Sequence, residues 1–102
     1  MNLRTELWIG QDGIFTRTNE YLSDLSVGGA FVQSENVYPI GSILNLRFRL
    51  AVAPNMLSCS GIVKKIHLGV GYAVQFLDIS RENIALIQRQ LDSPETPAAF
   101  SY

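Results

Sequence analysis

Residues 43–50, Ile-Leu-Asn-Leu-Arg-Phe-Arg-Leu, form the clearest structural pattern in this sequence. Apolar side chains occupy every second position and alternate with one asparagine and two arginines. Because successive side chains of a β-strand point to opposite faces, the pattern predicts a strand with one buried and one solvent-exposed face. Pro39 and Gly41 precede this strand and Pro54 follows it, as expected of the turns that bound it.

The residues that follow predict two more strands, so that three strands form an antiparallel meander. Residues 57–68 are apolar at alternate positions, with a change of parity near Gly61 that a β-bulge at this glycine would explain. The glycines of residues 69–71 predict a turn. The apolar side chains beyond it predict the inward face of the third strand (Tyr72, Val74, Phe76).

The N-terminal third predicts shorter strands. Residues 6–9 and 14–18 flank Asp12-Gly13, a dipeptide typical of hairpin turns, and two more strands are expected at residues 21–25 and 30–33. Six or seven strands are enough to close a small barrel and remove the edges of the sheet. We therefore expect an all-β fold, a small antiparallel β-barrel of six or seven strands.

One α-helix is expected at the C-terminal end of the barrel. Ser80 can cap its N-terminus, and Glu82 lies in the first turn, where negative charge is favourable. Apolar side chains at helical spacing predict a stripe that packs on the barrel (Ile84, Ile87, Leu91). Prolines in residues 93–102 predict a flexible tail after a single domain that spans residues 1–92.

Composition restricts the class of protein. At 102 residues, 47% of them hydrophobic, the chain can form one domain with a core of its own. The single cysteine, Cys59, suits a reducing compartment, and neither a membrane-spanning run nor the apolar core of a signal peptide occurs. We therefore expect a cytoplasmic protein with no membrane insertion. The net charge of -1 argues against a DNA or RNA polymer as partner.

The sequence offers no recognisable catalytic or metal-binding set. Asp24, Ser26 and His67 do not suit a hydrolase triad, because the carboxylate must lie behind the histidine and not beside the serine. Nucleophile-elbow, Walker and dinucleotide-binding glycine patterns do not occur, nor do clusters of Cys and His. We expect neither catalysis nor a metal or resident cofactor.

Residues 24–29, Asp-Leu-Ser-Val-Gly-Gly, have a chemistry that exceeds a structural role. Asp24 and Ser26, two apart on an expected strand, should point to the same side. A carboxylate can accept two hydrogen bonds from the N–H edge of a guanine, and a hydroxyl can contact a base or a phosphate. Gly28 and Gly29 permit positive φ and leave room for a ligand. The alternative is that Asp24 and Ser26 merely cap a glycine turn.

This segment and its setting resemble the PilZ domain, a bacterial six-stranded barrel with a C-terminal helix. Asp24, Ser26 and Gly29 match the family signature [D/N]-x-S-x-x-G, and both Gly41 before Leu-x-Leu-x-Phe and residues 71–76 also look similar to members of the family. The resemblance covers roughly residues 4–91. It implies binding of the second messenger cyclic di-GMP and relay of that signal to pili, flagella or polysaccharide synthases.

The arginine signature of the family, R-x-x-x-R, is incomplete. Arg4 can match its first arginine, but Trp8 stands where the second is required. In the family these arginines bind phosphate and stack on guanine. Trp8, Arg17 or a basic cluster could substitute for the missing group (Lys64, Lys65, His67). Each also has an ordinary explanation, as barrel packing, an exposed strand residue or protection of an edge strand.

Two hypotheses follow. In the first, the protein is a non-catalytic cyclic di-GMP receptor or adaptor that signals to a protein of a motility, pilus or exopolysaccharide system, with the ligand held by residues of both signatures (Arg4, Asp24, Ser26, Gly28, Gly29). In the second, it is a nucleotide-independent interaction module. Arg47 and Arg49, the apolar helix, and Phe100 with Tyr102 are its candidate docking surfaces.

Overall fold

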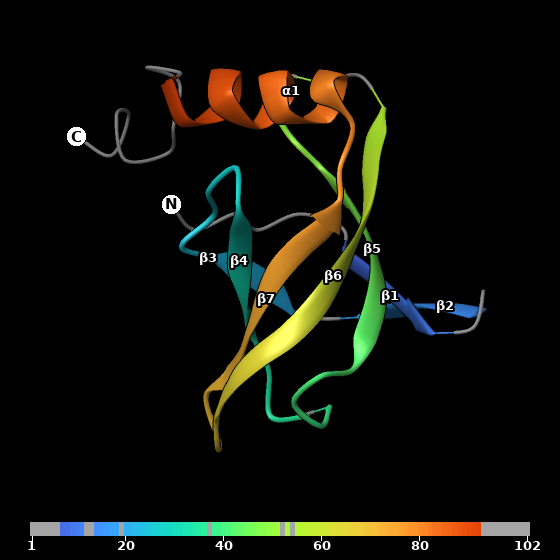
Figure 1. The fold of residues 1–102 in the computed structure, drawn as a ribbon, viewed down its shortest axis with the longest axis vertical. Coiled ribbons are helices and arrows are strands. Elements are labelled where there is room, and N and C mark those ends of the chain that lie inside the picture. Colours follow the sequence, from blue (N-terminus) through green and yellow to red (C-terminus); the bar gives the residue numbers. More distant parts are fainter. Residues whose placement is uncertain are drawn as a thin grey trace.

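The computed structural model describes residues 7–11, 14–18, 20–36, 38–51, 53 and 55–92. This part of the chain contains β1 (Leu7–Gln11), β2 (Ile14–Thr18), β3 (Tyr21–Ser23), β4 (Gly29–Gln33), β5 (Ile43–Arg49), β6 (Met56–His67), β7 (Gly71–Asp78) and α1 (Arg81–Asp92). The strands form one curled antiparallel sheet in the order β2-β1-β5-β6-β7-β4-β3, and α1 lies across one end of it (Figure 1). The predicted all-β fold with a C-terminal helix is confirmed.

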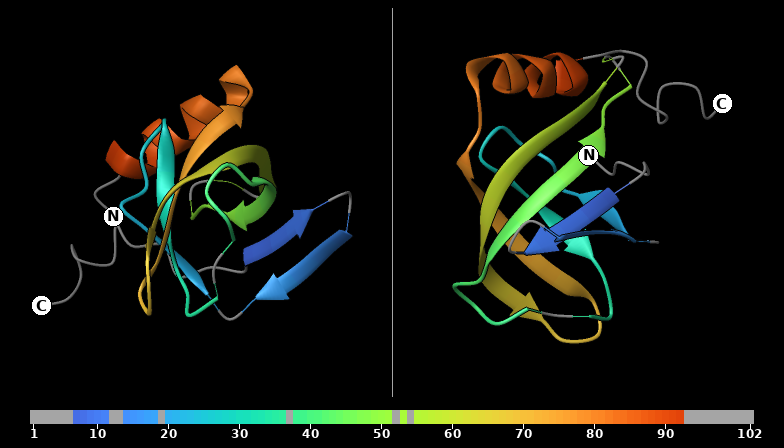
Figure 2. Two further views of the ribbon diagram at one scale, coloured as in Figure 1. Left: turned by 60° about the horizontal axis from the view of Figure 1, so that its bottom comes forward. Right: turned by 90° about the vertical axis from the view of Figure 1, so that its right-hand side faces the viewer.

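The sheet is open, which corrects the expectation of a closed six-stranded barrel. It has seven strands, and no backbone pairing joins β2 to β3 within the described ranges. The β1–β2 hairpin projects from the body of the molecule instead of folding onto β3 (Figure 2). The shortness of β3 contributes to the open sheet, because this strand has only three residues and ends before Asp24. A pocket of about 360 Å³ lies beside the edge strand β2, with Thr16, Glu20 and Tyr38 among its walls.

The meander of β5, β6 and β7 forms the centre of the sheet and of the core. β5 pairs with β6 from Ile43↔Ile62 to Arg49↔Met56. The alternation predicted for β5 is confirmed from Leu44 onward, because Leu44, Leu46 and Phe48 are fully buried and both arginines are exposed. Inward side chains of β7 meet those of β5 in the same core (Tyr72, Val74, Phe76).

The parity of β6 changes at Lys64 and not at Gly61, where we expected it. Val63 is still buried with the parity of the first half of the strand. The pairing with β7 then skips Lys64, which makes this residue a β-bulge, and Ile66 beyond it packs against the core. The register also shifts beside Gly61, but there the extra residue, Leu77, belongs to β7.

The helix begins as predicted and is fixed to the sheet at its first turn. Ser80 Oγ accepts a hydrogen bond from the backbone N–H of Asn83 at 3.1 Å, and Asn83 Nδ2 donates to the carbonyl oxygen of Ser58 at 3.1 Å. Ile87 is fully buried, whereas Ile84 is exposed. Ile84 is therefore not part of the packing stripe, because Asn83 occupies the position that faces β6. α1 is neither long nor apolar enough to cross a membrane. The predicted tail lies outside the described residues.

Tyr72 fills the middle of the core and is fully buried. Its ring meets that of Tyr38 edge to face, with 5.7 Å between the centroids. Among the described residues its hydroxyl has no hydrogen-bond partner. Burial, with a smaller contribution from the charge of Glu20, raises the pKa of Tyr72, so its phenol stays protonated.

We expect Tyr72→Phe to leave the free energy of unfolding unchanged or to raise it, because a buried hydroxyl without a partner costs about 1–3 kcal/mol. Tyr72→Ala, the control, should lower it by about 3–5 kcal/mol through the cavity that it creates. Urea denaturation followed by circular dichroism measures both. A loss of more than about 1 kcal/mol in Tyr72→Phe would show that the hydroxyl has a partner after all.

Candidate functional site

The candidate ligand residues lie on the loop that joins β3 to β4. β3 ends at Ser23, and Asp24 has a φ of 50°, in the left-handed region that aspartate tolerates better than most residues. Asp24 and Ser26 therefore do not lie on one strand, and the predicted reason for their shared orientation is wrong. Both side chains are exposed.

The hydroxyl of Ser26 takes part in the backbone hydrogen bonds of this loop. It accepts from the N–H of Gly28 at 3.2 Å and donates to the carbonyl oxygen of Gly29 at 3.3 Å. The N–H of Ser26 donates to the same carbonyl oxygen at 2.9 Å. These hydrogen bonds agree with the alternative interpretation, in which Ser26 caps a glycine turn. They leave one lone pair of the oxygen for a ligand donor.

The two glycines of the loop have different roles, and neither has a positive φ. A Cβ on Gly29 would collide with the carbonyl oxygen of Val74, so glycine here allows β4 to approach β7. A Cβ on Gly28 would meet only Ser26 Oγ, at 3.9 Å. The carbonyl oxygen of Gly28 accepts a hydrogen bond from the N–H of Phe76 at 2.8 Å, which fixes the loop to β7. The expectation of positive φ at the glycines is thus wrong, whereas open space at Gly28 is confirmed.

The carboxylate of Asp24 is the polar group of this loop that remains available. It is exposed, and among the described residues nothing pairs with it. β3, the loop and β4 contain no lysine or arginine. A carboxylate held beside open backbone on a fixed loop can accept paired N–H donors from a ligand.

The family model of the PilZ domain matches residues 9–93. The chain belongs to the PilZ domain family. PilZ domains are generally non-catalytic domains that bind cyclic di-GMP. A search of curated proteins found no match.

The structure does not bring Trp8, Arg17 or His67 to the β3–β4 loop. Trp8 and Arg17 are cross-strand neighbours on β1 and β2, and this hairpin lies on the opposite side of the molecule from the β3–β4 loop (Figures 1 and 2). His67 packs edge to face on Phe31, with 5.6 Å between the centroids, so its surroundings are those of a packing residue. Arg4 lies outside the described residues and before the segment that matches the PilZ model.

A second polar site, which the sequence did not reveal, lies where β5, β6 and β7 meet the start of α1. This pocket of about 310 Å³ is lined mainly by short polar side chains and one aromatic ring (Phe15, Asn45, Ser58, Ser60, Asp78, Asn83). Cys59 also borders it, but burial raises the pKa of its thiol to about 12, so it is not a nucleophile at neutral pH. The residues come from β2, β5, β6, β7 and α1, which are far apart in the sequence, and none belongs to a motif.

The geometry of the described residues does not support a catalytic or a metal-binding site. Within the described ranges no three Cys, His, Asp or Glu side chains gather closely enough to hold a metal ion. Asp24 and Ser26 share a loop on which Ser26 Oγ is bonded to the backbone. His67 lies on β6, and its ring faces Phe31.

We expect Gly29→Ala and Gly28→Ala to differ sharply although they are neighbours in the PilZ signature. Gly29→Ala should lower the free energy of unfolding by about 1–3 kcal/mol or more, because its Cβ has to displace the backbone of β7. Gly28→Ala should cost less than about 1 kcal/mol, because its Cβ enters open space. Urea denaturation compares them, and equal losses would contradict the packing role assigned to Gly29.

Proposed function

We propose that this PilZ domain is a non-catalytic receptor of the bacterial cytoplasm that binds cyclic di-GMP and relays its presence to a protein of a motility, pilus or exopolysaccharide system. Membership of the family supports the ligand class. The observation that carries the proposal is the Asp24 carboxylate, exposed and without a partner among the described residues, on a loop fixed to β7.

Asp24 is proposed to read one guanine of the ligand. The base presents two adjacent N–H donors, which a carboxylate accepts in a bidentate manner. A hydrogen bond to a charged group contributes about 1.5–3 kcal/mol, more than a bond between neutral groups. Ser26 holds the loop in shape and offers its remaining lone pair, and Gly28 leaves the backbone accessible. The fixed loop limits the entropy lost on binding.

The phosphates of the ligand require positive charge that β3, β4 and their loop do not supply. We assign this role to Arg4, the residue that fits the arginine signature. With Trp8 in place of the second arginine, one charge-assisted contact is missing. Its loss weakens binding about ten- to hundredfold relative to a complete signature. The proposal therefore implies micromolar affinity.

Asp24→Asn should weaken binding of cyclic di-GMP about tenfold or more, since the amide offers one acceptor and places two donors against the donors of guanine. Glu35→Gln is the matched control: it also removes an exposed carboxylate, but at the other end of β4. Isothermal titration calorimetry measures both, with circular dichroism to confirm folding. The receptor proposal fails if the unchanged protein gives no heat with ligand at high micromolar concentration, or if both variants bind equally well.

The second candidate is a PilZ-type interaction module that acts without nucleotide. It is favoured by the absence of lysine and arginine from β3, β4 and their loop, and by the bonding of Ser26 to its own backbone. In that case the affinity for a pilus, flagellar or polysaccharide component should be the same with and without cyclic di-GMP, and Asp24→Asn should leave it unchanged. A change on adding the nucleotide would favour the receptor.

A further inference from the structure

The outward side of β2, β1 and β5 forms a surface rich in arginine and aromatic side chains. Trp8 of β1 lies between two arginines, because it pairs with Arg17 on β2 and with Arg47 on β5. Phe15 and Arg49 face the same side at neighbouring positions. These five residues define the arginine–aromatic face. None of the outward positions of these strands, as far as the structure describes them, holds an acidic residue.

The side chains of this face are already ordered against one another. The guanidinium carbon of Arg47 lies 4.4 Å from the centroid of the Phe15 ring, a cation–π contact. The Phe15 ring in turn lies over Gly10, where a Cβ would be 3.1 Å from its Cδ1 atom. Because Gly10 leaves room for the ring, the ring and the guanidinium are stacked before any partner arrives. Such order reduces the entropy lost on binding.

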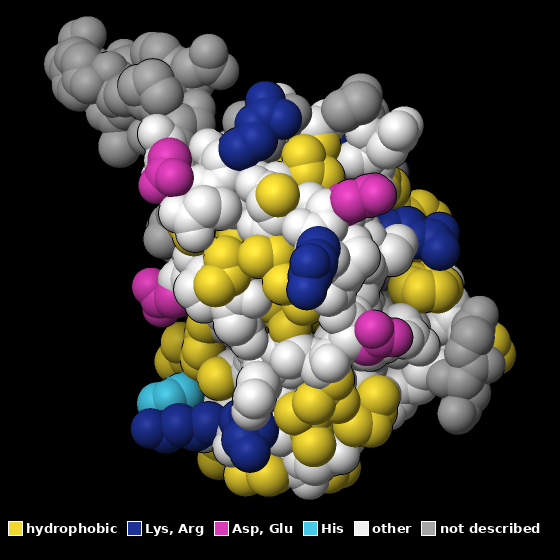
Figure 3. Space-filling model, turned by 45° about the horizontal axis from the view of Figure 1, so that its top comes forward, with side chains coloured by type: hydrophobic (Ala, Val, Ile, Leu, Met, Phe, Trp, Pro, Cys, Tyr) yellow, Lys and Arg dark blue, Asp and Glu magenta, His cyan; other side chains and the backbone are white. Residues whose placement is uncertain are grey.

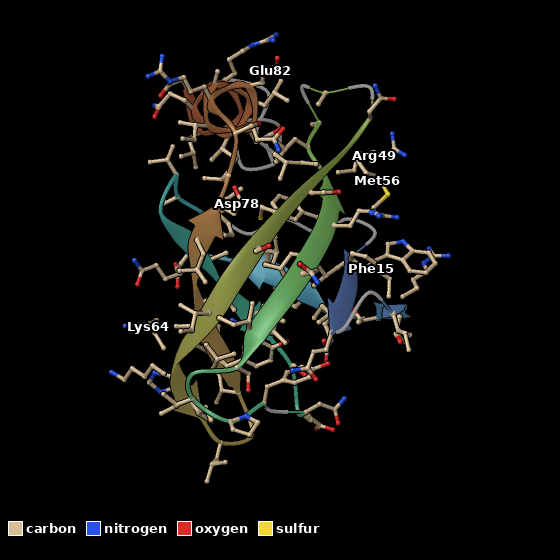
Figure 4. The ribbon with its side chains drawn as sticks, turned by 45° about the vertical axis from the view of Figure 1, so that its right-hand side comes forward. Phe15, Arg49, Met56, Lys64, Asp78 and Glu82 are labelled. Atoms are coloured by element: carbon tan, nitrogen blue, oxygen red, sulfur yellow. The ribbon has the colours of Figure 1, made fainter. Side chains whose placement is uncertain are left out.

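Positive charge on this face is concentrated relative to the rest of the protein. The whole chain has a net charge of -1, yet three arginines gather here. Phe15, Arg49 and Met56 lie at the right-hand side of the molecule in Figure 4, whereas Lys64 lies at its left-hand side. At the right-hand edge of Figure 3, basic side chains lie directly against hydrophobic ones. Tryptophan and arginine are the residues that most often dominate the energy of protein interfaces.

We propose that the arginine–aromatic face binds an amphipathic helix of a partner protein, with acidic residues seven positions apart and apolar residues between them. Neighbouring strands lie about 4.8 Å apart, so the backbones of Arg17 and Arg47, two strands apart, are separated by roughly 10 Å. Seven residues of a helix span about 10.5 Å. Apolar residues at positions i+3 and i+4, counted from the first acidic residue i, lie on the same helix face and cover Trp8.

The polar pocket beside α1 extends this face. Phe15 belongs to both, and Arg47 pairs with Ser58 in the pocket wall. A helix that lies across Trp8 can therefore place its next polar side chain against Asn45 and Asp78. The chain lacks the basic surplus that binding of a nucleic acid usually requires, whereas a helix with two acidic residues needs only the arginines of this face.

This inference goes beyond the binding of cyclic di-GMP, because it uses different residues on the other side of the molecule. Loss of nucleotide binding would leave it standing, and its failure would leave the role of Asp24 standing. Trp8 is the only tryptophan of the chain, so its fluorescence reports on this face alone.

The test uses the full chain and two synthetic helical peptides that contain no aromatic residue. The first has Glu at positions i and i+7 and Leu at i+3 and i+4, and the second replaces both Glu by Lys. The acidic peptide should produce a saturable change of Trp8 emission, and the basic peptide should not. Arg17→Glu with Arg47→Glu should weaken binding about tenfold or more, through two lost ion pairs and added repulsion.

Two further variants separate the site from general charge. Lys64→Glu with Lys65→Glu makes the same charge change on another face, and should leave peptide affinity within about threefold at moderate salt. Arg17→Lys with Arg47→Lys keeps the charge and should retain most of the binding. Circular dichroism and urea denaturation should show that the glutamate variants remain folded.

Three results would overturn the inference. The first is an unchanged Trp8 emission with the acidic peptide up to about 1 mM. The second is equal peptide affinity in the glutamate variant of Arg17 and Arg47. The third is saturable quenching of Trp8 by a short oligo-dT strand without any response to the peptide, which would identify the face as a nucleic-acid surface.

Discussion

Burial of every second side chain of β5 is the constraint on which both the core and the surface depend. The apolar half of the strand is sealed against β6 and β7. Because a strand alternates, the other half must face outward, and there it presents Arg47 and Arg49. A shift of register by one residue would bury both arginines and expose the core. The position of the positively charged face is therefore a consequence of the same pattern that builds the sheet.

β7 fixes the position of the β3–β4 loop, which carries the candidate ligand residues. Its inward side chains complete the core. Its backbone lies so close to β4 that only a glycine fits at position 29, and the N–H of Phe76 donates a hydrogen bond to the carbonyl oxygen of Gly28. The PilZ signature thus combines two kinds of residue. Gly29 and Ser26 shape the loop, and Asp24 projects from it with its carboxylate available. Of the three residues that match this signature, Gly29 therefore has a packing role, and the Asp24 carboxylate is the group most available to a ligand.

The sequence predicted those parts of the fold that local patterns determine. The alternation of β5, the β1–β2 hairpin and the cap at Ser80 each depend on neighbours within a few residues, and all were confirmed. Closure of the barrel depends on how the two edge strands meet in space. The left-handed backbone at Asp24 and the role of Gly29 depend on the approach of another strand. The pocket beside α1 was missed for the same reason, since its walls come from five separate elements.

A domain that relays a signal needs one surface for the ligand and another for the partner, and this sheet separates the two. The loop of Asp24 follows β3 at one end of the strand order, and the arginine–aromatic face lies around β1 at the other. A nucleotide and a helix bound at these places would not compete for the same side chains. The pairing of β7, β6 and β5 connects the two places within the sheet, and the pairing of β6 with β7 contains two register shifts. The bulge at Lys64 and the extra residue Leu77 are the places where that pairing is already interrupted, so they are where the sheet can change shape with the smallest loss of backbone hydrogen bonds.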